Sequence, residues 1–167
     1  AIALGYEVGL RVATCRPVAT IEKYASGRWV NFGVAAAAAR LLRLDEEQTA
    51  HALALAACEG PVVYLTPWSE FDGSSLKEGI PPATIAGVVA AYKARAGATG
   101  PVDVLDDADR FIRSVLLDGL GSTWEVERCY LKPYACCRYM HAAIDAILAL
   151  RKPGKPIRSL RIETFEH

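Results

Sequence analysis

The stretch "NFGVAAAAARLLRLDEEQTAHALALAACEG", residues 31–60, decides the fold of this chain. Its first half is rich in Ala, Leu and Arg, which are among the strongest helix formers, and it predicts a helix that ends near Leu44. Asp45 is a favourable N-cap, and Gln48 three residues later completes a capping-box pattern. We therefore expect a second helix to start directly after a tight corner. The two form a hairpin whose small side chains let the backbones pack closely.

Further helices are predicted on both sides of this hairpin. "ALGYEVGLRVA", residues 3–13, has apolar residues at spacings that permit a helix. "PPATIAGVVAAYKARAG", residues 81–97, has paired prolines suited to a first turn and Gly97 at a plausible C-cap. Between them, residues 61–81 mix Pro, Gly and Ser with aromatics, which predicts a structured loop of a length that is often functional. Another helix is expected after a cap within Asp106–Asp109.

The pattern changes after Gly121. "TWEVERCYLK", residues 123–132, alternates between two faces and predicts a short strand. A helix over 136–151 and a second alternating stretch over 157–165 follow. The sequence thus predicts a mainly α protein: residues 1–121 as part of a large helical, bundle-like domain, and residues 122–167 as the start of a small α/β lid domain.

Composition narrows the function classes. The chain has 167 residues, of which 52% are hydrophobic and 23% charged, so it can bury a core. Lys plus Arg equals Asp plus Glu at 19 each, and this balance provides no strong field toward nucleic acid or a membrane. Five irregularly spaced cysteines argue against a disulfide framework and favour the cytoplasm. Because the chain starts without Met inside a predicted helix, we expect it to be an excerpt of something longer.

Potentially reactive side chains are most concentrated in "LKPYACCRYMHAAIDAIL", residues 131–148. On the predicted helix, Cys137, His141 and Asp145 are spaced i, i+4, i+8 and form one polar stripe. A metal site is one interpretation, although the spacing matches no tetrahedral zinc pattern. A Cys–His–Asp nucleophilic triad is another, but side chains on one helix are held parallel. In the third, the cysteine packs, the histidine forms a hydrogen bond and the aspartate pairs with an arginine.

Cations surround this stripe. Lys132, Arg138 and His141, together with Lys77 from the long loop, would provide several positive groups on a neutral protein. Charge-assisted bonds from such groups to carboxylates are strong. The set therefore predicts a pocket for a di- or tricarboxylate, although each lysine alone is more often a solvated surface group.

Several segments, taken in order, resemble the MmgE/PrpD family, whose members include 2-methylcitrate dehydratase, cis-aconitate decarboxylase and iminodisuccinate epimerase. The resemblance implies a large helical domain with a smaller α/β lid. It also implies chemistry without a metal or redox cofactor: a proton is removed next to a carboxylate, and water or carbon dioxide is lost or the carbon is reprotonated. The segments are "GYEVGLRVA", "FGVAAAAARLLRLDEEQTAHALALAA", "SSLKEG", "AGVVAAYKARAGATGP" and "KPYACCRYMHAAIDAIL".

The resemblance also implies roles for single residues. Lys77 is similar to the family's loop lysine, and Lys132 to the lysine that opens its K-x-[YF] motif. Cys137 and His141 are similar to the Cys-or-His and His positions of that motif. On this basis Lys132 and His141 are expected to be catalytic, and Lys77 and Cys137 to contact substrate.

Two further residues complete the expected site. Arg138 is expected to clamp a substrate carboxylate, and Tyr24 to be an acid/base residue. The family usually has H-P-T where this chain has Tyr24-Ala25-Ser26, and a tyrosine, with a reference pKa of about 10, is a poor base at neutral pH.

The resulting expectation is a lyase that dehydrates or decarboxylates a small polycarboxylate such as 2-methylcitrate. An epimerase of the same family and a non-catalytic scaffold that binds a ligand or a partner are the alternatives. The expected partners are the polycarboxylate and either a second copy of the chain or a chain that carries the missing segments, with no nucleic acid and no membrane.

Overall fold

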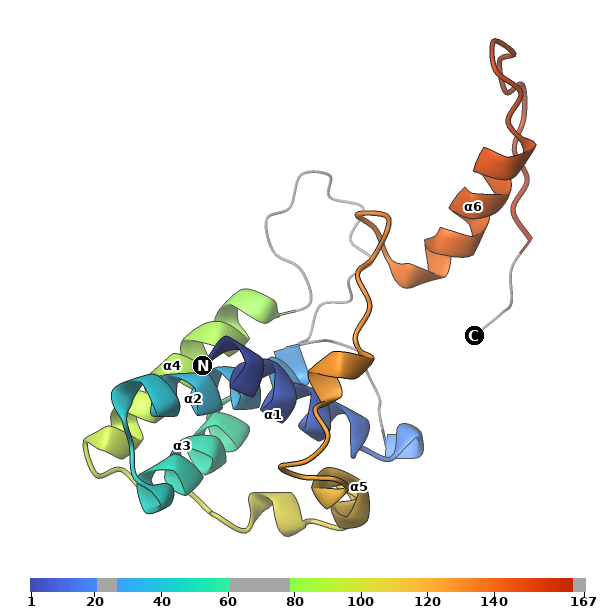
Figure 1. The fold of residues 1–167 in the computed structure, drawn as a ribbon. Helices are drawn as coiled ribbons and strands as arrows, with labels where there is room; N and C mark the ends of the chain where they lie inside the picture. Colours follow the sequence, from blue (N-terminus) through green and yellow to red (C-terminus); the bar gives the residue numbers. More distant parts are fainter. Residues whose placement is uncertain (21–26, 61–78, 164–167) are drawn as a thin grey trace. The chain divides into compact units, whose positions relative to one another are not determined.

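A computed structural model describes residues 1–20, 27–60 and 79–163 (Figure 1). The chain divides into two compact units, residues 1–128 and 129–167, which are described separately. Helices dominate, and no β-strand occurs in the described ranges, so the expectation of a mainly α protein is confirmed. The predicted boundary after residue 121 concerns the family's two domains and stays a prediction.

Four helices form the main body of the first unit. Helix α2 contacts each of the other three, and Figure 1 shows α1, α3 and α4 alongside it. Short helical elements lie after α1 and after α4, and the described part of the second unit, residues 129–163, contains η4 and α6. The elements are α1 (Ile2–Thr14), η1 (Val18–Thr20), α2 (Gly27–Leu42), α3 (Glu46–Glu59), α4 (Ile80–Arg95), η2 (Val104–Asp106), α5 (Arg113–Leu117), η3 (Glu125–Arg128), η4 (Arg138–Met140) and α6 (His141–Leu150).

The hairpin of α2 and α3 is confirmed, together with its capping box. The Asp45 carboxylate accepts a hydrogen bond from the Gln48 backbone N–H at 2.8 Å, and the Gln48 side chain accepts one from the Asp45 N–H at 3.3 Å. Arg43, just after α2, has a φ of 56°, and the Leu44 N–H closes the end of the helix on the Ala39 carbonyl at 3.0 Å. A left-handed residue is thus needed to turn the chain into α3.

The paired prolines lie in the first turn of α4, as predicted. At its other end, Gly97 follows the helix with a φ of 90°. The Gly97 N–H donates to the Ala94 carbonyl and the Ala98 N–H to the Lys93 carbonyl, both at 3.0 Å. This is a Schellman ending, and it confirms glycine as the C-terminal signal.

Glycines bring the helices of this unit into backbone contact. A Cβ at Gly33 of α2 would overlap the Gly5 carbonyl of α1, and it would also press on the backbone of Gly9. A Cβ at Gly87 of α4 would lie 2.6 Å from the Asn31 carbonyl. The buried core between α2, α3 and α4 is accordingly small in side-chain volume and consists of Ala35, Ala52, Leu55, Ala56, Ala90, Ala91 and Ala94.

The two predicted strands are wrong. Residues 125–128 form the 3₁₀ turn η3, in which the Glu127 N–H bonds to the Trp124 carbonyl at 3.1 Å. Residues 157–163 have no regular secondary structure, and residues 164–167 lie outside the described ranges. A β-strand is stable only when its backbone N–H and C=O groups form hydrogen bonds with a neighbouring strand, and an alternating side-chain pattern does not provide that neighbour. The start of an α/β lid is therefore not shown.

Two predicted helices are shorter than expected. The helix predicted from residue 136 begins at His141, after the 3₁₀ turn η4. The helix expected after Asp106–Asp109 is only the five-residue α5, because the aspartates close local turns: Asp106 pairs with Arg113 at 2.9 Å and Asp107 with Arg110 at 3.2 Å.

Gly33→Ala tests the close approach of α1 and α2. In an uncontacted helix this change would gain about 1 kcal/mol of helix propensity. Here the overlap with the Gly5 carbonyl dominates, and we expect a net loss of about 1–3 kcal/mol in the free energy of unfolding, measured by urea denaturation. The control Arg40→Ala, on the exposed face of α2, should change it by less than about 0.5 kcal/mol. A Gly33→Ala chain as stable as the parent would contradict the contact.

Arg43→Gly tests the left-handed turn. A non-glycine residue costs about 1–2 kcal/mol in this conformation, and glycine's greater freedom in the unfolded chain offsets part of the gain. We expect a net stabilisation of about 0.5–1 kcal/mol in the same measurement. Arg40→Gly is the matched control within α2 and should instead destabilise the chain by about 1 kcal/mol. Equal effects at both positions would refute the assignment.

Candidate functional site

Four of the six predicted site residues lie in the second unit, between residues 132 and 141. Tyr24 and Lys77 lie outside the described residues. The geometry of the site is therefore built on Lys132, Cys137, Arg138 and His141.

Lys132 and His141 meet at one backbone oxygen. Lys132 Nζ donates to the Cys136 carbonyl at 3.4 Å, and His141 Nε2 lies 3.4 Å from the same oxygen. The Lys132 side chain is exposed, whereas His141, the first residue of α6, is only 3% exposed. The turn formed by residues 132–141 thus places an ammonium group and an imidazole within reach of one small acceptor.

Tyr134 and Asp145 flank the imidazole. The Tyr134 ring meets the His141 ring edge to face, with the centroids 5.3 Å apart, and its hydroxyl donates to Asp145 Oδ1. The hydrogen bond to the Asp145 carboxylate raises the pKa of Tyr134 above its ordinary value, and burial adds to the rise. Asp145 lies one turn after His141 on α6, so the hydroxyl–carboxylate bond helps hold the Tyr134 ring against the imidazole.

The other two predicted residues are placed differently. Arg138 Nε donates to the Tyr130 hydroxyl at 3.1 Å, and its guanidinium carbon lies 5.9 Å from the centre of that ring. Cys137 precedes η4 in an extended conformation, with a ψ of 140°. The predicted stripe of Cys137, His141 and Asp145 on one helix is therefore wrong for Cys137. The sequence interpretation missed Tyr134. Its position two residues after Lys132, as the aromatic residue of the K-x-[YF] motif, could have identified it.

The cysteine thiols differ in access. All five cysteines are free of disulfides. Cys15 is fully buried, and burial raises the pKa of its thiol. Cys58 and Cys129 are exposed, and Cys136 and Cys137 are half-buried.

An open groove of about 410 Å³ lies in the first unit between α1 and α2. Among its lining side chains, Tyr6 is the single one with a hydroxyl, and none carries a charge. Such a groove does not suit a polycarboxylate. It is lined by Ile2, Gly5, Tyr6, Gly9, Leu10, Trp29, Val30, Gly33, Val34, Ala37 and Ile80.

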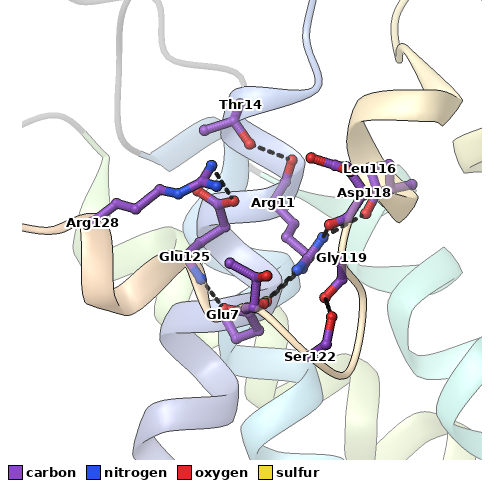
Figure 2. Close-up of polar contacts among 10 residues, drawn as sticks. Glu7, Arg11, Thr14, Leu116, Asp118, Gly119, Ser122, Glu125 and Arg128 are labelled. Atoms are coloured by element: carbon purple, nitrogen blue, oxygen red, sulfur yellow. Dashed lines mark hydrogen bonds and ion pairs between the residues drawn. The ribbon is translucent and has the colours of Figure 1, made fainter.

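A buried ion pair joins α1 to the end of the same unit (Figure 2). Arg11, which is 4% exposed, donates Nε to the carboxylate of Glu7, one turn earlier. Its other nitrogens donate to the carbonyls of Leu116 at 3.1 Å, Asp118 at 2.7 Å and Thr123 at 2.7 Å. The sequence interpretation missed this pair, although the i, i+4 spacing of Glu7 and Arg11 was its signal.

In the part of the chain that is described, no group of three or more His, Cys, Asp or Glu residues is arranged to hold a metal ion. No helix there has the length and apolar composition needed to cross a bilayer.

These features define a mainly helical protein with a lysine–histidine turn in a separate unit. The family model described as the MmgE/PrpD N-terminal domain matches residues 1–120. The chain belongs to the MmgE/PrpD family. No curated protein and no solved structure gives a significant match. The turn that contains Lys132 and His141 lies beyond the matched residues.

Asp145→Asn tests the contact that holds Tyr134. Without the carboxylate, we expect the pKa of Tyr134 to fall toward its ordinary value of about 10. Because the folded state favours the neutral phenol, the stabilising contribution of this contact is full below about pH 10 and is lost as pH rises through the raised pKa.

The readout is the pH titration of ¹³C-labelled tyrosine rings by NMR, in which Tyr134→Phe identifies the signal. Asp103→Asn, at an exposed aspartate of the first unit, is the control and should leave that titration unchanged. A Tyr134 titration that is identical in the parent and in Asp145→Asn would show that the hydrogen bond does not form.

Proposed function

We propose that this chain carries part of the active site of a lyase that dehydrates or decarboxylates a small polycarboxylate, such as 2-methylcitrate, by acid/base proton transfer. The observation that carries the proposal is the convergence of Lys132 and His141 on the Cys136 carbonyl. A substrate carboxylate that replaces this carbonyl as acceptor would accept hydrogen bonds from Lys132 Nζ and His141 Nε2. The family, which includes dehydratases and other lyases, supports this reaction class.

In the proposed reaction Lys132 and His141 have different roles. Lys132 holds the carboxylate next to the carbon that loses its proton, because an ammonium group stabilises the charge that develops there. His141 moves the proton. His141 Nε2 faces the carbonyl oxygen, and Nδ1 is the ring nitrogen that we propose takes up the proton.

The remaining predicted residues complete the proposal. Lys77 and Arg138 bind further carboxylates, Cys137 contacts substrate, and Tyr24 serves as the acid that returns a proton. Arg138 would have to leave Tyr130 or bind substrate with its free guanidinium nitrogens, because its Nε is engaged. Epimerisation uses the same first proton transfer, so product analysis separates it from elimination.

We also propose that the chain functions in association with a second copy or with another chain. The support is an exposed apolar face on α4, where Ile85 is 65% and Tyr92 53% exposed, with Val88 and Val89 between them at helical spacing. Native mass spectrometry of the purified chain, with its intact mass as reference, measures this association directly.

Turnover of 2-methylcitrate and cis-aconitate by the purified material tests the activity. We expect Lys132→Ala to lower kcat/KM by about 10²-fold or more, because a positioned charge is lost where charge develops in the transition state. Lys152→Ala, an exposed lysine of the same unit, is the matched control and should retain parental activity.

Equal activity in the two lysine variants would refute the site. Absence of turnover in material that is folded by circular dichroism and binds the substrates would favour the scaffold alternative.

A further inference from the structure

Two thiols lie next to each other in the turn between Lys132 and His141. Cys136 and Cys137 are adjacent in the sequence, half-buried and not joined by a disulfide. Because the two side chains share one short stretch of backbone, each thiol is held at a high effective concentration near the other. The turn therefore contains a vicinal dithiol, a group that a single two-electron oxidation converts into a ring.

The peptide group between the two cysteines is the one that Lys132 and His141 contact. Lys132 Nζ and His141 Nε2 each lie 3.4 Å from its oxygen, the Cys136 carbonyl. On the other side of the pair, the Cys137 carbonyl accepts a hydrogen bond from the Met140 N–H at 3.0 Å, at the start of η4. Any rotation of the peptide between the thiols thus acts directly on the contacts of Lys132 and His141.

The other cysteines differ from this pair. Cys15 is fully buried and its thiol donates to the Val12 carbonyl at 3.4 Å; burial raises the pKa of this thiol, so little of it is in the reactive thiolate form. Cys58 on α3 is exposed, but that helix contains no second cysteine. Cys129 is exposed and belongs to the same unit as the pair, so it is the alternative partner for either thiol.

A disulfide between adjacent cysteines would distort the peptide that joins them. Consecutive Cα atoms are about 3.8 Å apart across a trans peptide, whereas disulfides usually join Cα atoms about 4.4–6.8 Å apart. The peptide must therefore rotate to bring the two sulfurs into bonding distance, and the Cys136 carbonyl turns with it. The resulting strain makes such a bond easy to reduce again, which is typical of regulatory disulfides.

We propose that Cys136 and Cys137 form a thiol–disulfide modification site, which a small disulfide of the glutathione type oxidises to a vicinal disulfide. Closure of the ring turns the Cys136 carbonyl away from Lys132 and His141. The proposal concerns the chemistry of the two thiols and does not depend on the proposed lyase reaction.

The oxidation proceeds by two exchanges. One cysteine thiolate attacks a sulfur of the small disulfide, whose S–S bond breaks, so that a mixed disulfide forms and one small thiolate leaves. The neighbouring cysteine thiolate then attacks the protein sulfur of the mixed disulfide, forms the vicinal bond and releases the second small thiolate. The chain gives up two electrons and two protons, and the small disulfide becomes two thiols.

Peptide mapping after incubation with oxidised glutathione tests the site. Free thiols are blocked with N-ethylmaleimide before digestion, and the tryptic peptide 129–138 contains all three cysteines of the second unit. We expect it to carry the blocking group on Cys129 alone, with Cys136 and Cys137 joined. Cys136→Ser and Cys137→Ser should lose this bond and retain one glutathione instead. Cys58→Ser, at an exposed cysteine of the first unit, is the control and should form the bond like the parent.

A second readout reports the effect on the turn. Imidazole signals of the ¹⁵N-labelled chain are recorded by NMR before oxidation, after it and after reduction with dithiothreitol, and His141→Gln identifies the His141 signals. We expect the His141 ring signals to shift on oxidation and to return on reduction. His51 on α3, in the first unit, is the internal control and should keep its signals.

Three results would overturn the proposal. The first is a peptide in which Cys136 and Cys137 both stay blocked or hold only glutathione while Cys58 takes up glutathione. The second is a disulfide between Cys129 and either member of the pair. The third is a vicinal disulfide that leaves the His141 signals unchanged, since the carbonyl would then not have moved.

Discussion

The buried pair of Glu7 and Arg11 is the contact on which the C-terminal segment of the first unit, residues 104–128, depends. Residues 104–128 contain only short helical turns, so they bury little apolar surface of their own. Arg11 binds the Leu116, Asp118 and Thr123 carbonyls, and Glu7 also accepts the Glu125 N–H. These bonds attach the segment to α1. Removal of either charge would leave the other buried and unpaired, a change that costs about 3–5 kcal/mol in comparable pairs.

A second constraint is the use of small residues where helices cross. Gly5, Gly33 and Gly87 allow backbones to touch, and alanines fill most of the core between α2, α3 and α4. A core of this kind buries few large side chains. Large apolar residues such as Ile85 and Tyr92 remain on the outer face of α4, which is why association with another chain is part of the proposed function.

Local signals in the sequence predicted the helical part of the fold well. The Asp45 capping box and the ending at Gly97 depend on residues a few positions apart, and both are present. The strand at 123–132 failed because its backbone is held by Glu7 and by its own turn, a tertiary contact that alternation cannot reveal. Lys132 and His141, both named from the sequence motif, lie at the same carbonyl, and their roles stay predictions. The contact of Tyr134 with His141 depends on the fold of the turn itself.

The roles of Lys132 and His141 are the central claim of this account, because dehydration and epimerisation both begin with removal of a proton beside a carboxylate, and decarboxylation needs a proton delivered to the carbon that loses carbon dioxide. The most direct measurement is incorporation of deuterium from D₂O into 2-methylcitrate, cis-aconitate and related polycarboxylates, followed by NMR. The account predicts incorporation at the carbon next to a carboxylate and its loss in His141→Gln and Lys132→Ala. Incorporation that persists in both variants, or none in folded material that binds the substrate, would contradict it.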